Sequence, residues 1–341
     1  MSKHPSETGS TIPESRDPGS GIILCIKEML SSGDLSDVSF TVGRLLGEAR
    51  NFSAHKVILA ARSPVFRAML YGSLPENCDA PIDISDILPE AFANLLSFLY
   101  TDAMDALSMD NVLPTMGCAD KYDVPRLVAI CSDFVISQLN PENCLAMLEE
   151  AFYWNFGGVV EKCLDFTDSW SEAILQSGHF TNISQETLEM ILQRNTLSVE
   201  ENEIYVAVES WARAACSRNG LDPSAAANRR QMLGSALFLV RFPLMTNAQL
   251  ADGPGTSGLL SEAEITSIFL FLNARVKPPL PFSSQRRIGS MKVDRNFSRD
   301  SSTFPPGEDM VDWLICASSS QPSIPRPISS KFGVGRGFSF R

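Results

Sequence analysis

Residues 54–70 read AHKVILAARSPVFRAML, and this stretch decides the fold of the first third of the chain. Ser63-Pro64 places a capping hydroxyl before a proline at a first helical position, which predicts a helix start. Phe66, Met69 and Leu70 then fall on one face of that helix. We therefore expect an amphipathic helix that buries this face against neighbouring elements.

Short strands are predicted on both sides of this helix. Residues 37–42 alternate apolar and polar side chains, as a half-buried strand does, and residues 81–84 are a second candidate. Pro89 then opens another helix, with Phe92 and Leu99 on its apolar face. The first third is therefore predicted to be an α+β domain of helices with a small sheet.

The signals from residue 140 onward are almost all helical. Asn140-Pro141 and Asp222-Pro223 repeat the pattern of a capping residue followed by proline. Ser198-x-x-Glu201 and Ser261-x-x-Glu264 have the spacing of capping boxes. The apolar stripes of these helices must be buried against each other, which predicts an all-helical domain. Three tryptophans are predicted to lie in its core: Trp154, Trp170 and Trp211.

Length and composition agree with two domains. The chain has 341 residues, of which 44% are apolar and 20% charged, as in ordinary globular proteins. Four segments are predicted: a disordered tail at 1–20, the α+β domain at 21–140, the helical domain at 141–276, and a Pro/Ser-rich linker and tail at 277–341.

Several classes of function are disfavoured by composition. A formal net charge of −12 would repel nucleic acid phosphates. The apolar runs are shorter than the roughly 20 residues that span a membrane, and the polar start does not resemble a signal peptide. The eight cysteines form no Cys-x-x-Cys pair and only three histidines are present, so we expect reduced thiols and neither a metal nor a cofactor.

The sequence offers little for catalysis. It contains no G-x-S-x-G motif, and three histidines make a catalytic triad improbable. His55 is interpreted as a structural hydrogen-bonding residue rather than as a base or a metal ligand. The chain is therefore predicted not to be an enzyme.

A resemblance to a known family joins these segments. Residues 34–40 and 54–70 closely resemble the BTB/POZ domain, and the similarity continues through residues 95–102 and 119–127. It covers about residues 30–140. The resemblance implies a protein-interaction domain that forms two-fold dimers.

The helical part resembles a second domain. Residues 141–245 look like the BACK domain, which follows BTB domains in adaptors of cullin-3. Residues 241–245, RFPLM, and 257–261, SGLLS, are similar to the BTB–BACK–PHR subfamily. The chain departs from that subfamily after about Pro281, because the remaining 60 residues are too few for the β-sandwich of a complete PHR domain.

The resemblance implies two sets of interaction residues. The family binds cullin-3 through a hydrophobic-x-Glu motif, which Leu74-Pro75-Glu76 matches in position. Tyr122 is expected near the same face, and the helix pair at 141–168 corresponds to the family's cullin-contacting 3-box. The residues assigned to the dimer interface are Ile22, Ile23, Ile26, Leu30, Asp37 and Lys56, the last two as a buried charged pair.

The predicted function is that of a cytoplasmic adaptor. The dimer would hold cullin-3 and recruit an unidentified protein substrate for ubiquitination. Two alternatives stay open at this point. One is a truncated BTB protein that recruits nothing and regulates longer relatives by mixed dimerisation, and the other is a transcriptional co-regulator.

Overall fold

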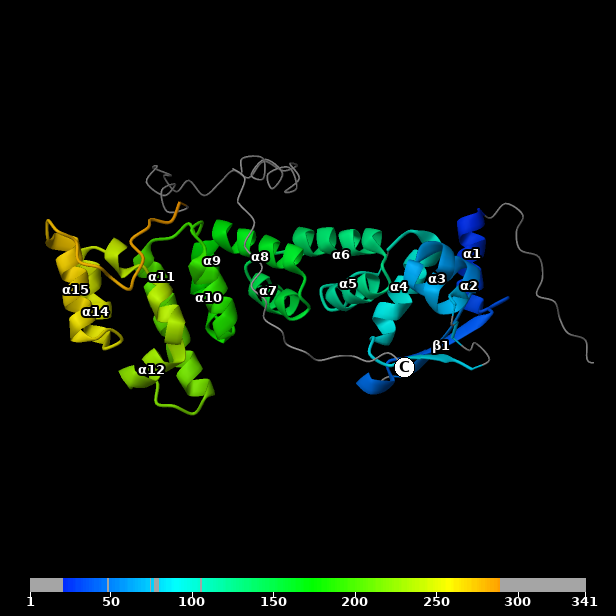
Figure 1. Ribbon diagram of the computed structural model, residues 1–341, viewed down its shortest axis with the longest axis horizontal. Helices are drawn as coiled ribbons and strands as arrows, with labels where there is room; N and C mark the ends of the chain where they lie inside the picture. Colours follow the sequence, from blue (N-terminus) through cyan, green and yellow to red (C-terminus); the bar gives the residue numbers. More distant parts are fainter. Residues whose placement is uncertain (1–20, 48, 74, 77–79, 105, 289–341) are drawn as a thin grey trace, which may run out of the picture. The chain divides into compact units, whose positions relative to one another are not determined.

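The computed structural model describes residues 21–47, 49–73, 75–76, 80–104 and 106–288 (Figure 1). The elements up to residue 138 are α1 (Ile22–Ser32), β1 (Val38–Val42), η1 (Arg44–Leu46), β2 (Arg50–Ala54), α2 (Lys56–Arg62), α3 (Pro64–Tyr71), β3 (Ile82–Ile84), α4 (Pro89–Thr101), α5 (Val112–Lys121) and α6 (Pro125–Gln138).

The elements described between residues 139 and 288 are all helical. They are α7 (Cys144–Tyr153), α8 (Gly157–Ser169), α9 (Ser171–Gln176), η2 (Phe180–Asn182), α10 (Gln185–Gln193), α11 (Glu201–Arg218), α12 (Ala226–Leu233), η3 (Gly234–Leu239), η4 (Phe242–Leu244), α13 (Asn247–Asp252), α14 (Pro254–Ser257) and α15 (Glu262–Asn273). The predicted fold class, helices with a small sheet followed by an all-helical region, is confirmed.

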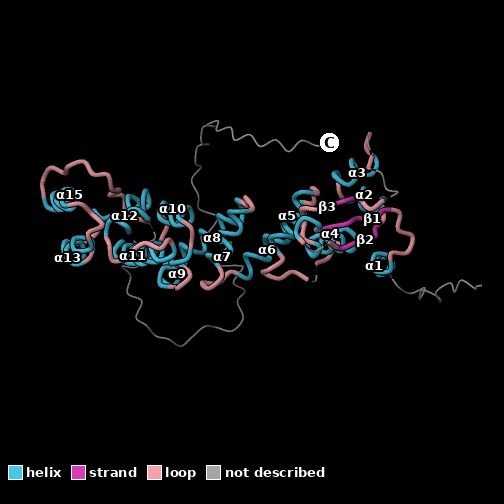
Figure 2. The backbone as a smooth tube through the Cα atoms, turned by 90° about the horizontal axis from the view of Figure 1, so that it is seen from below, coloured by secondary structure: helices cyan, strands magenta, loops and turns pink. Residues whose placement is uncertain are grey.

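A three-stranded sheet organises the first part, with β1 in its centre (Figure 2). β2 pairs with β1 antiparallel, whereas β3 pairs with β1 parallel. Val38, Phe40 and Val42 alternate into the core, as the period of two along a strand requires. The two strands predicted at 37–42 and 81–84 are both confirmed.

A cluster of aromatic rings holds the sheet to its helices. Phe40 of β1 lies edge-on to Phe66 of α3 and Phe92 of α4, with ring centroids 5.9 and 5.4 Å apart. Tyr122, which follows α5, stacks on Phe66 at 4.2 Å. Each such pair contributes about 0.5–1.5 kcal/mol beyond the burial of its apolar area.

Two of the predicted helix starts are confirmed in detail. Ser63 accepts a hydrogen bond from the backbone N–H of Phe66 at 3.1 Å, and Pro64 is the first residue of α3. Ser261 and Glu264 form the capping box of α15. These side chains satisfy N–H groups that have no partner within the helix.

Two other helices begin later than the prediction placed them. α7 starts at Cys144, three residues after Pro141, and α12 starts at Ala226, three residues after Pro223. The Asn140 side chain accepts hydrogen bonds from the next backbone N–H groups at 3.0 Å and forms a turn before the helix. An Asx turn has the same residue preferences as a helix cap, so the pattern did not separate the two.

The capping box predicted at Ser198 and Glu201 is displaced by two residues. The structure forms it with Glu200 and Glu203. The backbone N–H of Ser198 instead donates to Ser171 Oγ at 3.1 Å, which holds Ser198 in the preceding loop. The carboxylate of Glu201 is thereby left to face the interior.

Only one of the three tryptophans lies in the core as predicted. Trp211 is 3% exposed and donates its indole N–H to the carbonyl of Ile183 at 2.9 Å. Trp154 and Trp170 are 39% and 49% exposed, so the prediction is wrong for them. Both follow the last residue of a helix, where the helical stripe that predicted their burial has ended.

Residues 280–288, which we call the strap, return across the helices after α15. Phe282 is buried against Phe242 and Phe238, with ring centroids 5.0 and 5.6 Å away. Arg287 is also fully buried. The sequence interpretation of a linker and loose tail from residue 277 did not anticipate this packing.

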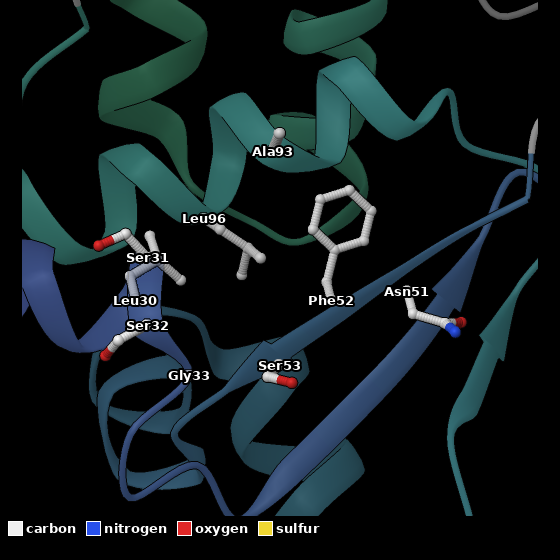
Figure 3. Close-up of a pocket in the computed structure, with 9 residues that line it drawn as sticks. All are labelled: Leu30, Ser31, Ser32, Gly33, Asn51, Phe52, Ser53, Ala93 and Leu96. Carbon is white, nitrogen blue, oxygen red and sulfur yellow. The ribbon is translucent and has the colours of Figure 1, made fainter.

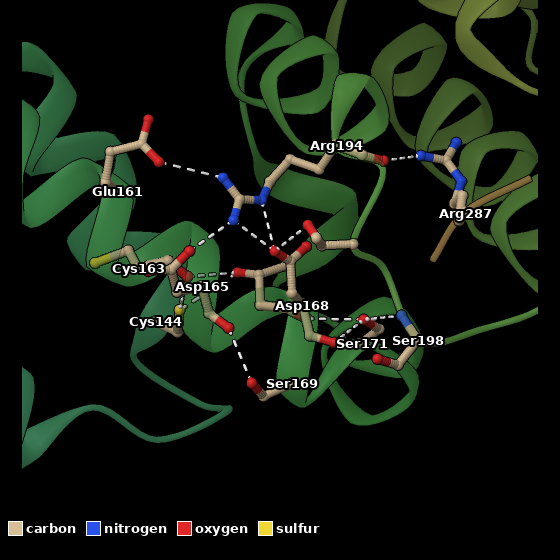
Figure 4. A network of polar contacts seen from close by, with 12 residues as sticks. Cys144, Glu161, Cys163, Asp165, Asp168, Ser169, Ser171, Arg194, Ser198 and Arg287 are labelled. Carbon is tan, nitrogen blue, oxygen red and sulfur yellow. Dashed lines mark hydrogen bonds and ion pairs between the residues drawn. The ribbon is translucent and has the colours of Figure 1, made fainter. Parts of the chain in front are cut away.

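A polar network connects the strap to α8 (Figure 4). Arg194 forms ion pairs with Glu161 at 3.2 Å and Asp165 at 2.7 Å, and its Nε donates to Asp168 at 2.7 Å. The backbone carbonyl of Arg194 accepts a hydrogen bond from Arg287. Burial raises the pKa of Asp168, although Arg194 counteracts the shift.

Candidate protein-interaction surfaces

The first candidate surface is α3 together with the turn between α5 and α6. Ser63 Oγ donates to the carbonyl oxygen of Tyr122 at 2.6 Å, and the stacked rings of Phe66 and Tyr122 lie directly beneath. The inner side of α3 is therefore locked to the α5–α6 turn. Its outer side presents Arg67 and Tyr71 to solvent.

The predicted cullin-binding residues divide into three cases. Leu74 lies outside the described residues. Pro75 and Glu76 are exposed just beyond α3, where the backbone N–H of Glu76 donates to the carbonyl of Met69 at 2.9 Å. Tyr122 is 1% exposed, so its side chain does not reach the surface and instead positions α3.

The second candidate surface is the outer side of α1. Ile26 and Leu30 are half-buried and pack toward the core. Ile22 and Ile23 are 75% and 58% exposed, and Leu24 is exposed beside them. Apolar side chains in a row on a helix are costly to leave in water, because burying one contributes about 1.5–3 kcal/mol.

The expected charged pair of Asp37 and Lys56 is not formed. Asp37 is exposed, and its carboxylate accepts a hydrogen bond from the backbone N–H of Lys56 at 2.8 Å. Lys56 is the first residue of α2, so Asp37 caps that helix from a distance in sequence. The physical reason is that a free N–H at a helix start competes for the carboxylate with the mobile ammonium group.

His55 has the structural role predicted for it. Its Nδ1 lies 2.7 Å from the Tyr100 hydroxyl and its Nε2 lies 2.8 Å from the carbonyl oxygen of Asp34. A carbonyl only accepts, so we assign the proton of the neutral ring to Nε2 and let the Tyr100 O–H donate to Nδ1. Burial raises the pKa of Tyr100 to about 12.

A pocket adjoins the α1 surface (Figure 3). It has a volume of about 370 Å³ and lies between the end of α1, β2 and α4. Leu30, Phe52 and Leu96 supply its apolar lining, and Ser31, Ser53 and Asn51 supply polar groups. Leu30 thus belongs both to the pocket lining and to the predicted dimer interface.

A third surface lies at the turn between α7 and α8, inside the helix pair expected at 141–168, but its exposed aromatic residues were not predicted from the sequence. Tyr153 is 83% exposed and Phe152 is exposed beside it. Trp154 stacks on Phe156 and covers Gly117 of α5, where an added Cβ would lie 3.1 Å from the indole ring. This exposure could have been predicted from the run of aromatic residues at 152–156, because a helix end cannot bury all of them.

The described part of the chain holds no group of three or more potential metal ligands. None of the helices described is long and apolar enough to cross a membrane. Five cysteines within the described residues are buried free thiols: Cys118, Cys131, Cys144, Cys163 and Cys216.

Comparison with known families agrees with the two structural regions. Residues 26–139 match the BTB/POZ domain, and residues 144–253 match the family described as BTB And C-terminal Kelch, or BACK. This chain is a BTB–BACK protein. Both regions of this BTB–BACK protein belong to a non-catalytic scaffold family, and a BTB domain implies protein–protein interactions, often dimerisation.

Relatives extend the comparison. BTB/POZ domain-containing protein 6 of Mus musculus is 39% identical over 261 residues, which are 76% of this chain and 48% of that protein. Protein 6-A of Danio rerio is 40% identical over the same shares. BTB/POZ domain-containing protein 3 of Homo sapiens is 38% identical over 79% of this chain and 52% of its own length. The BTB–BACK chain thus spans about half the length of these relatives.

Proposed function

We propose that this BTB–BACK protein is a dimeric substrate adaptor for a cullin-3 RING ubiquitin ligase. The observation that carries the proposal is the outer side of α3. Tyr71, Pro75 and Glu76 are exposed there, while the hydrogen bond and ring stack at Tyr122 hold the helix rigidly from behind. A rigid face with an aromatic anchor beside a carboxylate suits a partner helix.

The turn between α7 and α8 supports the same proposal. It belongs to the helix pair that the resemblance assigns to additional cullin contact. Tyr153 and Phe152 are exposed there, and Trp154 rests on Gly117 of α5. Exposed aromatic residues on a fixed backbone are typical of side chains that dominate binding energy.

The α1 surface supports dimerisation. Ile22 and Ile23 leave apolar area in water that a second copy would cover, and a two-fold interface uses one patch on both subunits. We keep Ile26, Leu30, Asp37 and Lys56 in the proposed interface region, with Asp37 now as a helix cap.

The rest of the proposal concerns organisation and place. We propose that the BTB domain spans 21–140 and the BACK domain 141–276, and that the protein acts in the cytoplasm. We propose that its substrate is a protein and that this substrate binds to the BACK helices.

The test is a pull-down of the purified full chain with the N-terminal region of cullin-3, with the molar mass read by light scattering. We expect a complex of two chains of each protein. Leu74→Asp should abolish binding and leave the dimer intact, because a charge replaces the apolar anchor. Tyr153→Ala should weaken binding.

Val206→Asp is the matched control, because Val206 is an exposed apolar residue of α11 in the BACK region. It should bind cullin-3 as the wild type does. A dimer that does not bind cullin-3 would overturn the adaptor proposal. Unchanged binding of Leu74→Asp would overturn only the assignment of the α3 surface.

A further inference from the structure

Glu201 and three backbone carbonyls surround the buried guanidinium group of Arg287, and we call these acceptors the arginine socket. The Glu201 carboxylate oxygens lie 3.0 and 3.1 Å from Nε and Nη2 of Arg287. The carbonyl oxygens of Leu192 and Leu239 accept from Nη1 and Nη2 at 2.8 and 3.4 Å, and that of Arg194 also accepts from Nη1. The side chains of Glu201 and Arg287 are 4% and 1% exposed.

The arginine socket distinguishes arginine from lysine. A guanidinium carries five N–H donors in a planar fork, whereas an ammonium is a compact group with three. In the socket the carboxylate faces Nε and Nη2, while carbonyls face Nη1 and Nη2. A lysine would leave buried acceptors unpaired, and unpaired buried polar groups are costly.

Few buried side chains anchor the strap. Within the strap, Phe282 and Arg287 are buried and Leu280 is half-buried against the core. The Arg241 guanidinium also donates to the carbonyl of Gln285 at 2.8 Å, and the backbone N–H of Ile288 donates to the carbonyl of Asn195 at 2.6 Å. Ordering an extended segment costs conformational entropy at every residue, so a segment held by three side chains is less strongly stabilised than a packed helix. We therefore expect the strap to open at a lower free energy than the helices beneath it.

We propose that the arginine socket is a peptide-binding site that the chain closes with its own strap, and that an arginine-bearing segment of a partner protein occupies it when the strap opens. The seated strap defines the chemistry of the ligand. An aromatic residue enters the space beside Phe238 and Phe242, and an arginine five positions later enters the socket, as Phe282 and Arg287 do. This binding is separate from that of cullin-3.

The first test uses the full chain with Phe282→Ala and Arg287→Ala, which vacates the site. The probe is a fluorescent peptide of residues 280–288, LPFSSQRRI, and binding is followed by anisotropy. The vacated chain should bind it at least tenfold more tightly than the wild type, in which the strap competes. Adding Glu201→Gln to the vacated chain should abolish binding.

Neighbouring arginines give a matched pair of probe peptides. Arg286 is exposed, so an R286K peptide should bind as the parent peptide does. An R287K peptide keeps the charge but should lose at least tenfold in affinity. If a folded vacated chain binds neither peptide, or binds the parent and R287K peptides equally, the proposal is overturned.

The wild-type chain offers a second test that needs no folded variant. The Ile288 N–H donates to the carbonyl of Asn195 at 2.6 Å, so its hydrogen exchange reports opening of the strap. Under native conditions it should exchange at least tenfold faster than amides in the middle of α11. If the Ile288 amide and the α11 amides both exchange only when the whole protein unfolds, the strap does not open on its own. That result would overturn the proposal.

Discussion

Arg287 and Glu201 form a buried, two-pronged ion pair between residues 86 positions apart in the sequence. Glu201 is the first residue of α11, where the helix dipole also favours a negative charge. Its Oε1 accepts a further hydrogen bond from the backbone N–H of Arg241 at 2.8 Å. A buried pair of this kind contributes little net stability, but removing one member leaves the other charge without compensation.

Arg287→Ala should lower the free energy of unfolding by about 3 kcal/mol, near the low end for a broken buried pair, because the strap can open and let water reach Glu201. Arg286→Ala, at the exposed neighbour, should change it by less than about 0.5 kcal/mol. Urea unfolding of the two variants measures the difference. Equal midpoints would contradict the structural role of the ion pair.

Tyr100→Phe should destabilise the BTB region by about 1–3 kcal/mol, because it leaves the backbone N–H and Nδ1 of buried His55 without their partner. Tyr153→Phe removes the same hydroxyl at a site that is 83% exposed and should have no measurable effect. Thermal unfolding monitored by circular dichroism compares them. A similar melting temperature for both variants would contradict this account of His55.

Glu264→Gln should destabilise the protein in a pH-dependent way. The Arg230 guanidinium, at 2.8 Å, and the Ser261 cap hold the pKa of Glu264 at about 2, below its ordinary value of 4.5. A lowered carboxyl pKa stabilises the fold above the unfolded value and loses that effect as the pH falls through the folded value. The difference in unfolding free energy between wild type and variant should therefore be full above about pH 5 and shrink toward pH 2. A difference independent of pH would contradict the assignment.

Gly117→Ala should disturb the α7–α8 turn, since the new methyl group would lie 3.1 Å from the Trp154 ring. The indole must move, so the tryptophan fluorescence should shift and the stability should fall by about 1 kcal/mol. In a Trp154→Ala background the same substitution should be neutral or stabilising, because alanine favours a helix over glycine. An unchanged spectrum would show that the ring does not rest on Gly117.

Ile23→Asp should convert the proposed dimer to a monomer, because two charges would face each other across a two-fold axis. Val276→Asp introduces the same charge at an apolar side chain that is 85% exposed after α15, and it should leave the dimer intact. Light scattering gives the molar mass of both. A dimer that survives Ile23→Asp would move the interface away from α1.

Much of the fold could be predicted from local patterns. The alternation at 37–42 and the Ser63-Pro64 cap each report on residues close in sequence, and the structure confirms both. His55 could likewise be assigned a structural role, because an isolated histidine with no second ligand or nucleophile has nothing to catalyse.

The remainder depends on contacts between distant residues. No local pattern links Glu201 to Arg287, so Glu201 was interpreted as part of a capping box and the strap as a loose linker. Trp154 was placed in the core because helical spacing does not reveal where a helix ends. At the candidate surfaces, only exposed side chains can contact a partner. Tyr122 was predicted to contact one from the family resemblance, but its side chain is buried, because sequence similarity does not report exposure.

The long separation of the ion pair also has a consequence for protein synthesis. Glu201 leaves the ribosome well before Arg287, which neutralises it, and at about 5–20 residues per second the chain takes roughly 4–17 s to grow by the 86 positions that separate them. During that interval the Glu201 carboxylate at the start of α11 lacks its ion-pair partner. Completion of this region is therefore a late event, timed by the arrival of Arg287.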